Sequence, residues 1–290
     1  MTTTAETAPF RFFALEVVRT RRLGPSLLRV TFTGPGIDGF AAGGRDQSLT
    51  LFLPHPGQDA PVVPVPEDGD MYTALGAWRA LPDDVRAVLR SYTVREHRPE
   101  AREFDIDFAL HDDGGSSGPA SRWATAAAPG DRAMVLGPAV ADNTAVRCRP
   151  PAGSDHLLLW ADETALPAAA AILEWLPAEF SAQVWLSVRH AGDRQELATK
   201  ADATVTWLVA GEDAPDPVEA FRAAELPDGA TPYAWIAGES GVVKELRRHL
   251  VRERGLDRGA VTFVGYWKRG VSEDGLREEA AAPEDDDGDV

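Results

Sequence analysis

Residues 90–95 read RSYTVR and combine three side chains that suit one class of ligand. The guanidinium of Arg90 can donate two parallel hydrogen bonds to a pyrophosphate. The ring of Tyr92 can cover a flat heterocycle, and the hydroxyl of Thr93 can bond its polar edge. A flavin nucleotide offers a pyrophosphate, a flat ring and a polar edge at N5, where hydride arrives and leaves. The run therefore predicts a flavin site.

Strand alternation places Tyr92 on the opposite face from Ser91 and Thr93 if this run is a strand. Local backbone twist must then bring Tyr92 and Thr93 to the same ligand. An ordinary half-buried strand would carry the same residue types, so the prediction depends on motifs later in the chain.

A glycine-rich loop at residues 114–118 precedes an expected helix at residues 120–127. Such a loop can present free backbone N–H groups to a phosphate, and Ser121 adds a hydroxyl at the helix start. Together with Arg90, this helix start can hold a pyrophosphate from two sides, and Trp123 can cover part of the ligand. The alternatives are a flexible surface loop and a tryptophan that belongs to the core.

Residues 160–168, WADETALPA, form an expected strand, turn and helix start, where a nicotinamide nucleotide would bind. The GxGxxG pattern is absent there, and Asp162 and Glu163 stand where glycines would let a phosphate approach. A nucleotide must therefore bind without the usual cradle, or weakly. The structural alternative is that Thr164 caps the helix and the two carboxylates stabilise its positive end.

Aromatic and basic residues adjoin at the end of the last expected strand, in the run GYWKRG at residues 265–270. The ring of Tyr266 or Trp267 can lie against the flavin face that a nicotinamide must reach. Lys268 and Arg269 would then stand at the mouth of the site. The alternative is an aromatic core plug with two solvated cations.

The first half of the chain contains six short segments of alternating apolar residues separated by turn signals, which predict a six-stranded antiparallel β-barrel. Two of these strands lie within residues 12–34, and the others lie at 48–54, 91–97, 103–111 and 132–138. The long insertion at residues 55–89 is expected to contain a short helix near residues 83–89.

The second half alternates strands and helices, which predicts an α/β domain with a parallel sheet covered on both faces. The expected strands are 156–161, 183–190, 204–210, 233–240 and 261–267, and the expected helices are 164–176, 216–224 and 241–255. Ligands bind at the carboxyl ends of such strands, the edge that would face the barrel. We place the boundary near Pro150 and Pro151 and expect domains at 10–150 and 151–270.

The composition argues against several classes of protein. A formal net charge of −17 over 290 residues disfavours nucleic-acid binding, and no apolar run is long enough to span a membrane. The single Cys148 rules out an internal disulfide and cysteine-rich metal sites. With an N-terminus that lacks signal-peptide features, it favours the cytoplasm. Residues 271–290 hold nine acids and one Arg, and we expect an acidic disordered tail.

The runs RSYTVR, DFALH, GPASRWA, DETALPA, AGES and GYWKRG occur in an order that resembles the siderophore-interacting proteins. These proteins are flavin-dependent ferric-siderophore reductases of the ferredoxin-reductase-like superfamily. The resemblance runs from about Phe12 to Gly270. It implies a flavin-binding barrel followed by an α/β pyridine-nucleotide domain, FAD as cofactor, and NADPH or NADH as electron donor.

The resemblance also implies roles for particular residues. The residues implied to bind FAD are Arg90, Ser91, Tyr92, Thr93, Asp107, Ala109, His111, Gly118, Ala120, Ser121, Trp123, Tyr266 and Trp267. The DETALPA loop, with Asp162, Thr164 and Ala165, would lie beside the nicotinamide. Lys268 and Arg269 would attract an anionic ferric siderophore. Family members often carry a lysine in the stretch that reads DQSLTLF here, so one expected cation is missing.

The expected activity is electron transfer from NADPH or NADH, by way of FAD, to the Fe(III) of a docked siderophore. Iron is released because Fe(II) binds hard oxygen chelators far more weakly. Arg189, His190 and Arg194 can read a 2′-phosphate and favour NADPH, or they form an exposed basic turn. Two other functions stay open: a flavin reductase with another acceptor or a ferredoxin-type donor, and a non-catalytic cytosolic siderophore-binding protein.

Overall fold

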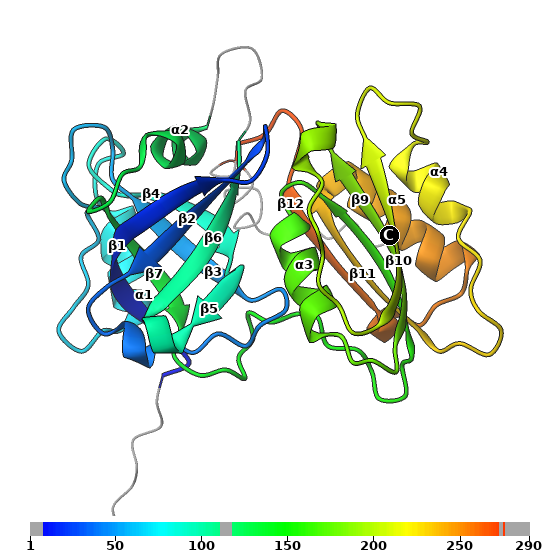
Figure 1. Ribbon diagram of the computed structural model, residues 1–290. Coiled ribbons are helices and arrows are strands. Elements are labelled where there is room, and N and C mark those ends of the chain that lie inside the picture. The colour runs from blue at the N-terminus through cyan, green and yellow to red at the C-terminus, as the bar shows by residue number, and fades with distance from the viewer. Residues whose placement is uncertain (1–7, 111–117, 273–274, 276–290) are drawn as a thin grey trace, which may run out of the picture.

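The computed structural model describes residues 8–110, 118–272 and 275, and within them the chain forms two sheets that lie side by side (Figure 1). The first sheet is antiparallel, with the strand order β4-β3-β7-β1-β2-β6-β5. Its strands are β1 Phe10–Arg22, β2 Leu27–Thr33, β3 Ser48–Leu53, β4 Val88–Thr93, β5 Glu96–Arg98, β6 Glu103–Ala109 and β7 Arg132–Pro138.

The predicted six-stranded barrel differs from the structure, which has seven strands in an open sheet over the described residues. The expected strand at 91–97 is two strands. Thr93 at the end of β4 pairs with Ser48 of β3, whereas Glu96 at the start of β5 pairs with Asp105 of β6. The chain turns between them, so the run expected as one strand supplies both edge strands of the sheet, and no strand pairing within the described residues closes it.

A cluster of buried side chains fills the concave side of the first sheet. Phe13, Val30, Ile106 and Val135 are at most 2% exposed, and each lies on an alternating strand, as the sequence pattern predicts. The helix α2 Pro119–Ala126 packs its small residues against this cluster. The position of α2 fixes one wall of the site described below.

The helix expected near residues 83–89 is wrong, because the insertion folds its helix earlier, as α1 Met71–Arg79. The carboxylate of Asp70 caps α1 by accepting a hydrogen bond from the Thr73 backbone N–H at 2.7 Å. Residues 88 and 89 already belong to β4, which pairs with β3 over its full length.

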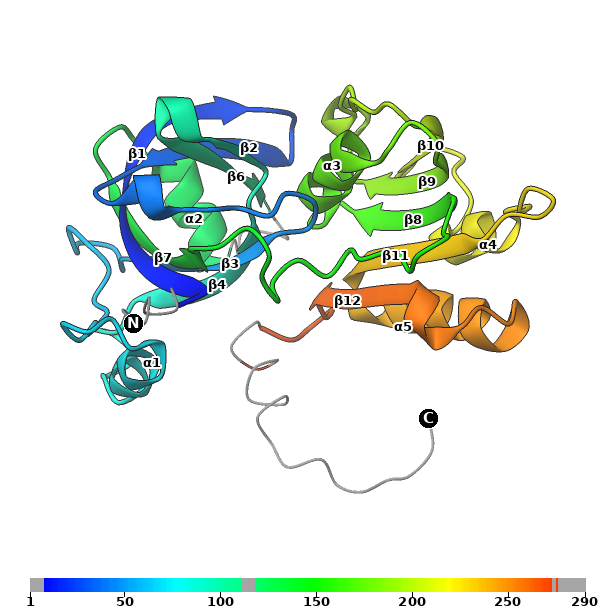
Figure 2. The same ribbon diagram turned by 90° about the horizontal axis from the view of Figure 1, so that it is seen from below.

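The second sheet is parallel, as predicted, and the structure gives it the strand order β10-β9-β8-β11-β12. Its strands are β8 His156–Asp162, β9 Ser181–Val188, β10 Asp202–Val209, β11 Pro232–Glu239 and β12 Val261–Trp267. The helix α3 Leu166–Trp175 covers one face, while α4 Pro217–Arg222 and α5 Ser240–Arg248 cover the other (Figure 2). All seven residues of β8 are buried, which explains its continuous apolar run.

Side chains from both halves interlock where the two sheets meet. Leu27 of β2 belongs to the apolar cluster beneath α3. The Arg95 guanidinium forms two hydrogen bonds, of 2.7 and 3.0 Å, with the Glu174 carboxylate on α3. The buried Asp193 carboxylate accepts a hydrogen bond from the Ser26 backbone N–H at 2.8 Å. These contacts fix the relative position of the two sheets.

Among the described residues, no helix is long and apolar enough to cross a membrane.

A buried ion-pair network on the first sheet predicts acid sensitivity. Asp105 is 3% exposed and accepts two hydrogen bonds from Arg98, at 2.7 and 2.8 Å, and one from Thr31 at 2.7 Å. Burial by itself would raise the pKa of Asp105, but the hydrogen bonds from Arg98 and Thr31 outweigh it and lower the pKa below its ordinary value of 3.8.

Because the folded pKa of Asp105 is lowered, this carboxylate stabilises the fold fully above pH 3.8, and the contribution is lost as the pH falls through the folded value. We expect urea midpoints to decrease over that range, and the decrease to be shallower in Asp105→Asn. The exposed Glu100→Gln serves as control. Identical pH profiles for Asp105→Asn and the native protein would contradict this account.

Candidate active site

A pocket of about 460 Å³ lies between the two sheets, and residues of β4, α2 and β12 line it. Twelve of the residues expected from the sequence are among its walls. They are Arg90, Ser91, Tyr92, Thr93, Asp107, Ala109, Gly118, Ala120, Ser121, Thr164, Tyr266 and Trp267. The pocket therefore joins motifs from both halves of the chain at one place.

β4 lines the pocket with four consecutive residues, from Arg90 to Thr93. It is an edge strand, and all four residues border the pocket although their side chains alternate between the two faces of the strand. The ring of Tyr92 packs against Phe108, with centroids 4.5 Å apart. The Arg90 guanidinium donates to the Leu89 carbonyl at 2.6 Å, and Thr93 is 5% exposed.

The start of α2 forms the next wall. Gly118 is the N-cap and makes no side-chain capping hydrogen bond, and there is open space where a Cβ would stand. The Ser121 hydroxyl donates to the Ala109 carbonyl at 3.2 Å. Trp123 does not line the pocket; it stacks on Phe32 in the core cluster. His111 lies outside the described residues.

Asp107 brings a buried carboxylate to the pocket. It is 5% exposed and forms two hydrogen bonds with the Arg29 guanidinium, at 2.6 and 2.9 Å. The pair spans β2 and β6. Arg29 thus neutralises the acid that stands beside the start of α2.

The acids of the β8–α3 turn, Asp162 and Glu163, do not line the pocket. Asp162 is buried and accepts hydrogen bonds from Thr164, Glu239 and Trp267. Burial raises the pKa of Asp162, and the neighbouring Glu163 charge adds to the shift. Glu163 pairs with Arg189 at 2.9 Å. The N-cap of α3 is Ala165 and not Thr164, and no side chain caps the helix. Of the loop residues expected beside the nicotinamide, Thr164 lines the pocket, while Asp162 and Ala165 do not.

The end of β12 supplies the aromatic wall. Burial raises the pKa of Tyr266, the Asp46 carboxylate adds to the shift, and a hydrogen bond with Thr93 opposes it. Tyr266 therefore links β12 to β4. The backbone of Lys268 forms an isolated antiparallel β-bridge with Val271. The exposed Arg269 donates its backbone N–H to the Glu239 carboxylate at 3.3 Å. Neither cation is among the pocket walls.

Several pocket residues were not among the candidate site residues predicted from the sequence. They are Asp46, Ser48, Pro119, Arg147, Pro167, Val264, Gly265 and Val271. The Arg147 backbone N–H donates to Asp46 at 3.0 Å, so two segments 101 residues apart form this wall. Pro119, Pro167 and Gly265 lie inside motifs that the sequence had singled out, and Ser48 lies in the run DQSLTLF.

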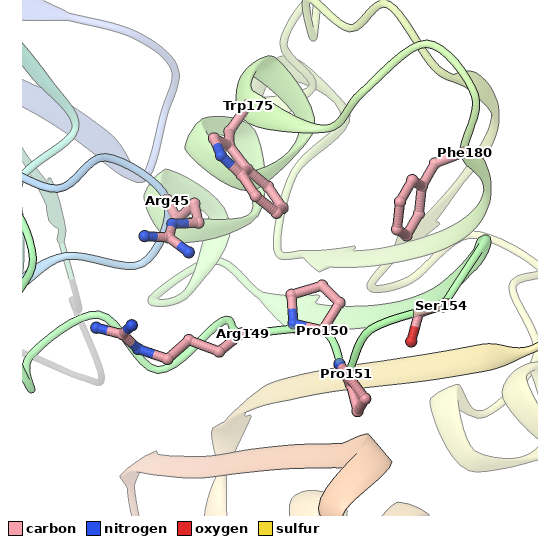
Figure 3. Close-up of a pocket in the computed structure, with 8 residues that line it drawn as sticks. Arg45, Arg149, Pro150, Pro151, Ser154, Trp175 and Phe180 are labelled. Carbon is pink, nitrogen blue, oxygen red and sulfur yellow. The ribbon is translucent and has the colours of Figure 1, made fainter.

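Another pocket, of about 400 Å³, lies near the start of β8, at the opposite end of that strand from Thr164 (Figure 3). The guanidinium of Arg45 stacks over Trp175 at 4.9 Å and donates to the Cys148 carbonyl at 3.0 Å. The guanidinium of Arg149 bonds Val146, Asn143 and Asp142. Both cations thus bind the chain itself, and this pocket is a seam between the two halves.

Two family models match the chain. Residues 16–142 match the siderophore-interacting FAD-binding domain, and residues 154–270 match the siderophore-interacting protein model. Ferric vibriobactin reductase ViuB of Vibrio cholerae is 31% identical over 268 residues, which cover 91% of this chain and 92% of that protein. The NADPH-dependent ferric-chelate reductase of Escherichia coli is 32% identical, with 89% and 93% covered.

Solved structures show the same architecture. A siderophore utilization protein from T. fusca is 37% identical, covers 92% of this chain and 96% of its own, and aligns with a TM-score of 0.76. A ferredoxin reductase of carbazole 1,9a-dioxygenase, 17% identical, aligns with a TM-score of 0.62 over 90% of this chain and 71% of its own. That second likeness shows the ferredoxin-reductase-like fold.

Proposed function

The chain belongs to the siderophore-interacting protein family, and we propose on that premise that it is an FAD-dependent reductase that transfers electrons from NADPH or NADH to the iron of a ferric siderophore. One observation carries the proposal: Arg90, Thr93, the start of α2 and the β12 aromatics converge on one pocket between the two sheets. Pockets at such a junction are common cofactor sites.

The residues present fit FAD. Arg90 and the open first turn of α2 would hold the pyrophosphate, because a guanidinium fork and free backbone N–H groups both suit phosphate oxygens. Tyr92, Thr93 and Tyr266 would hold the ring. Gly118 leaves room at the α2 start, where nothing lies within 4 Å of an added Cβ. When bound, FAD supplies the hydride acceptance and single-electron transfer that no side chain of the chain offers.

The chain's own task is to position two ligands and to keep water away from one of them. Tyr92 and Phe108, both from the first sheet, pack together. Tyr266 and Trp267 line the pocket from the second sheet. Arg147, with Lys268 and Arg269 next to the aromatic wall, supplies positive charge for an anionic ferric chelate. Reduction to Fe(II) then weakens the hold of the chelate's hard oxygen ligands on the metal.

The proposal is tested by anaerobic stopped-flow with the purified protein. It should be yellow, and mixing the photoreduced protein with ferric chelates should reoxidise it and yield Fe(II), trapped by a ferrous-specific dye. A panel of anionic and neutral chelates defines the substrate class. Colourless protein that does not take up FAD would refute the proposal and leave a chelate-binding role.

The choice of donor is a finer proposal. Arg189 pairs with Glu163 and Arg194 pairs with Glu212, both within 2.9 Å, whereas His190 is exposed. These pairs reduce the positive charge available for a 2′-phosphate. Steady-state kinetics with NADPH, NADH and a reduced ferredoxin would rank the donors, and equal efficiency for the two nucleotides would remove any selectivity role for this turn.

We also propose a cytoplasmic location and a domain boundary near Pro150 and Pro151. The first is supported by the presence of a single cysteine, the buried Cys148, since this sequence has no second cysteine for an internal disulfide. The second is supported by the strands of the two sheets, which end at Pro138 and resume at His156. Cell fractionation and limited proteolysis would test them.

A further inference from the structure

The parallel sheet has one position where a phosphate would ordinarily bind. The strand order runs outward from β8 to β9 and β10 on one side and to β11 and β12 on the other. The loops after β8 and β11 therefore leave toward opposite faces, and the crevice between them is the usual site for a nucleotide's diphosphate. Two helix starts, those of α3 and α5, would provide the N–H donors.

In this chain the side chain of Asp162, the last residue of β8, fills that crevice. Its Oδ1 accepts hydrogen bonds from the Thr164 backbone N–H at 2.9 Å and the Thr164 hydroxyl at 2.5 Å. Its Oδ2 accepts the Glu239 backbone N–H at 2.8 Å and the Trp267 indole N–H at 2.7 Å. Asp162 is 6% exposed, so these four donors surround a carboxylate that is shut off from water.

The neighbouring strand β11 leaves space for this carboxylate. Gly238, at the end of β11, has φ +143°, and a Cβ there would stand 2.5 Å from the Asp162 carboxylate. The next residue, Glu239, caps α5 by accepting hydrogen bonds from the Gly241 and Val242 backbone N–H groups at 2.7 and 3.1 Å. The Thr164 backbone N–H just before α3 and the Gly241 and Val242 N–H groups at the start of α5 are thus already bonded to carboxylates.

We propose that Asp162 takes the place of a phosphate in this crevice: it pins the Trp267 indole to the wall of the cofactor pocket and excludes the electron donor's diphosphate from the sheet. Asp162 is then a positioning residue, because it acts on the pocket through Trp267. The inference rests on the proposed function for the identity of the donor, but the Asp162–Trp267 contact itself does not.

Two physical effects support exclusion of the diphosphate. A second anion in the crevice would meet the Asp162 and Glu239 carboxylates at close range, where little water screens the repulsion. It would also find the four donors already used, so no hydrogen bonds would offset its desolvation. The nicotinamide of the electron donor can still reach the pocket, while its diphosphate stays outside the crevice between β8 and β11.

The first test compares AMP with ADP-ribose, which carries a diphosphate, by ligand-observed NMR on the flavin-loaded protein. We expect the two dissociation constants to agree within about threefold, because the second phosphate gains no contacts. Asp162→Gly, which empties the crevice, should tighten ADP-ribose at least tenfold and leave AMP unchanged. Native protein that binds ADP-ribose tenfold or more tightly than AMP would overturn the proposal, even if the glycine variant failed to fold.

The second test measures the coupling between Asp162 and Trp267. Asp162→Asn presents an amide group toward the indole N–H and should slow flavin reduction by the donor about tenfold, as should Trp267→Phe. The double variant should be no slower than either single variant, because both break the same contact. Asp228→Asn, which makes the same substitution at an exposed acid in the turn before β11, is the matched control.

The same samples separate this inference from the proposed function. Reoxidation of the photoreduced protein by a ferric chelate needs no nucleotide, so it should be unchanged in Asp162→Asn. Loss of that reaction in the native protein would refute the reductase proposal. Additive effects in the double variant would refute the pinning of Trp267 while leaving the reductase proposal intact.

Discussion

Replacing Arg90 with alanine should strip the protein of its flavin. A guanidinium that forks onto a pyrophosphate forms charge-assisted hydrogen bonds, and truncating one such partner costs roughly 2–4 kcal/mol, which is about 30- to 1,000-fold in the dissociation constant. Arg90 lines the pocket opposite the start of α2. The loss should appear as colourless purified protein and as a weakened affinity in FAD titrations that follow flavin fluorescence.

Two further variants sharpen the Arg90 result. Arg90→Lys keeps the charge but not the planar fork, so it should retain FAD at an intermediate affinity. Arg19→Ala removes an arginine whose side chain is 51% exposed and pairs with Glu103 away from the pocket, so FAD affinity should stay native. Full flavin occupancy in Arg90→Ala would show that other residues hold the pyrophosphate.

Replacing Asp46 with alanine should cause a large loss of stability. Asp46 is 3% exposed and accepts hydrogen bonds from the Arg147 and Cys148 backbone N–H groups, at 3.0 and 2.9 Å, and from the Trp235 indole at 3.0 Å. Each buried donor left unpaired costs about 1–3 kcal/mol. The free energy of unfolding should therefore fall by about 3–5 kcal/mol in urea titrations.

The position of Asp46 makes this loss specific to the junction of the two halves. Trp235 lies in β11 and is fully buried, so hydrogen exchange should increase at β11 and at residues 147 and 148 before it increases in β1. Asp142→Ala is the control, because Asp142 is 88% exposed in its pair with Arg149 and such pairs contribute little. A loss below about 1 kcal/mol in Asp46→Ala would contradict the account.

Much of the fold followed from local patterns. The strand at 132–138 agrees with β7 in every residue. The parallel sheet, the alternation of its strands with helices along the chain, and the helices on both of its faces were also predicted. The reason is that apolar packing on one face imposes a period of two on β6, whose other face buries Asp105 and Asp107 in ion pairs. Apolar packing on both faces imposes a continuous apolar run on β8. The helix expected near 83–89 does not form, because the Asp70 cap begins α1 earlier and residues 88 and 89 pair with β3.

The candidate site divides in the same way. The run RSYTVR already contained four residues of the pocket, because one edge strand carries them and their ligand-binding chemistry can be inferred from the residue types alone. Asp46 and Arg147 could not be recognised, since the wall that they form joins segments about a hundred residues apart. The role of Asp162 was also hidden: its type suggested repulsion of a phosphate, but not that it faces inward to Trp267.

The amino-acid order by itself determined the kind of ligand, the two-part architecture and the approximate position of most strands and helices, because these depend on side-chain chemistry and on periodicity over a few residues. Only the tertiary structure decided that the first sheet stays open, that its edge strand shares a pocket with β12, and which carboxylates face ligand and which face the chain. Those outcomes depend on how two separately formed sheets pack, and packing brings together groups that no local spacing relates.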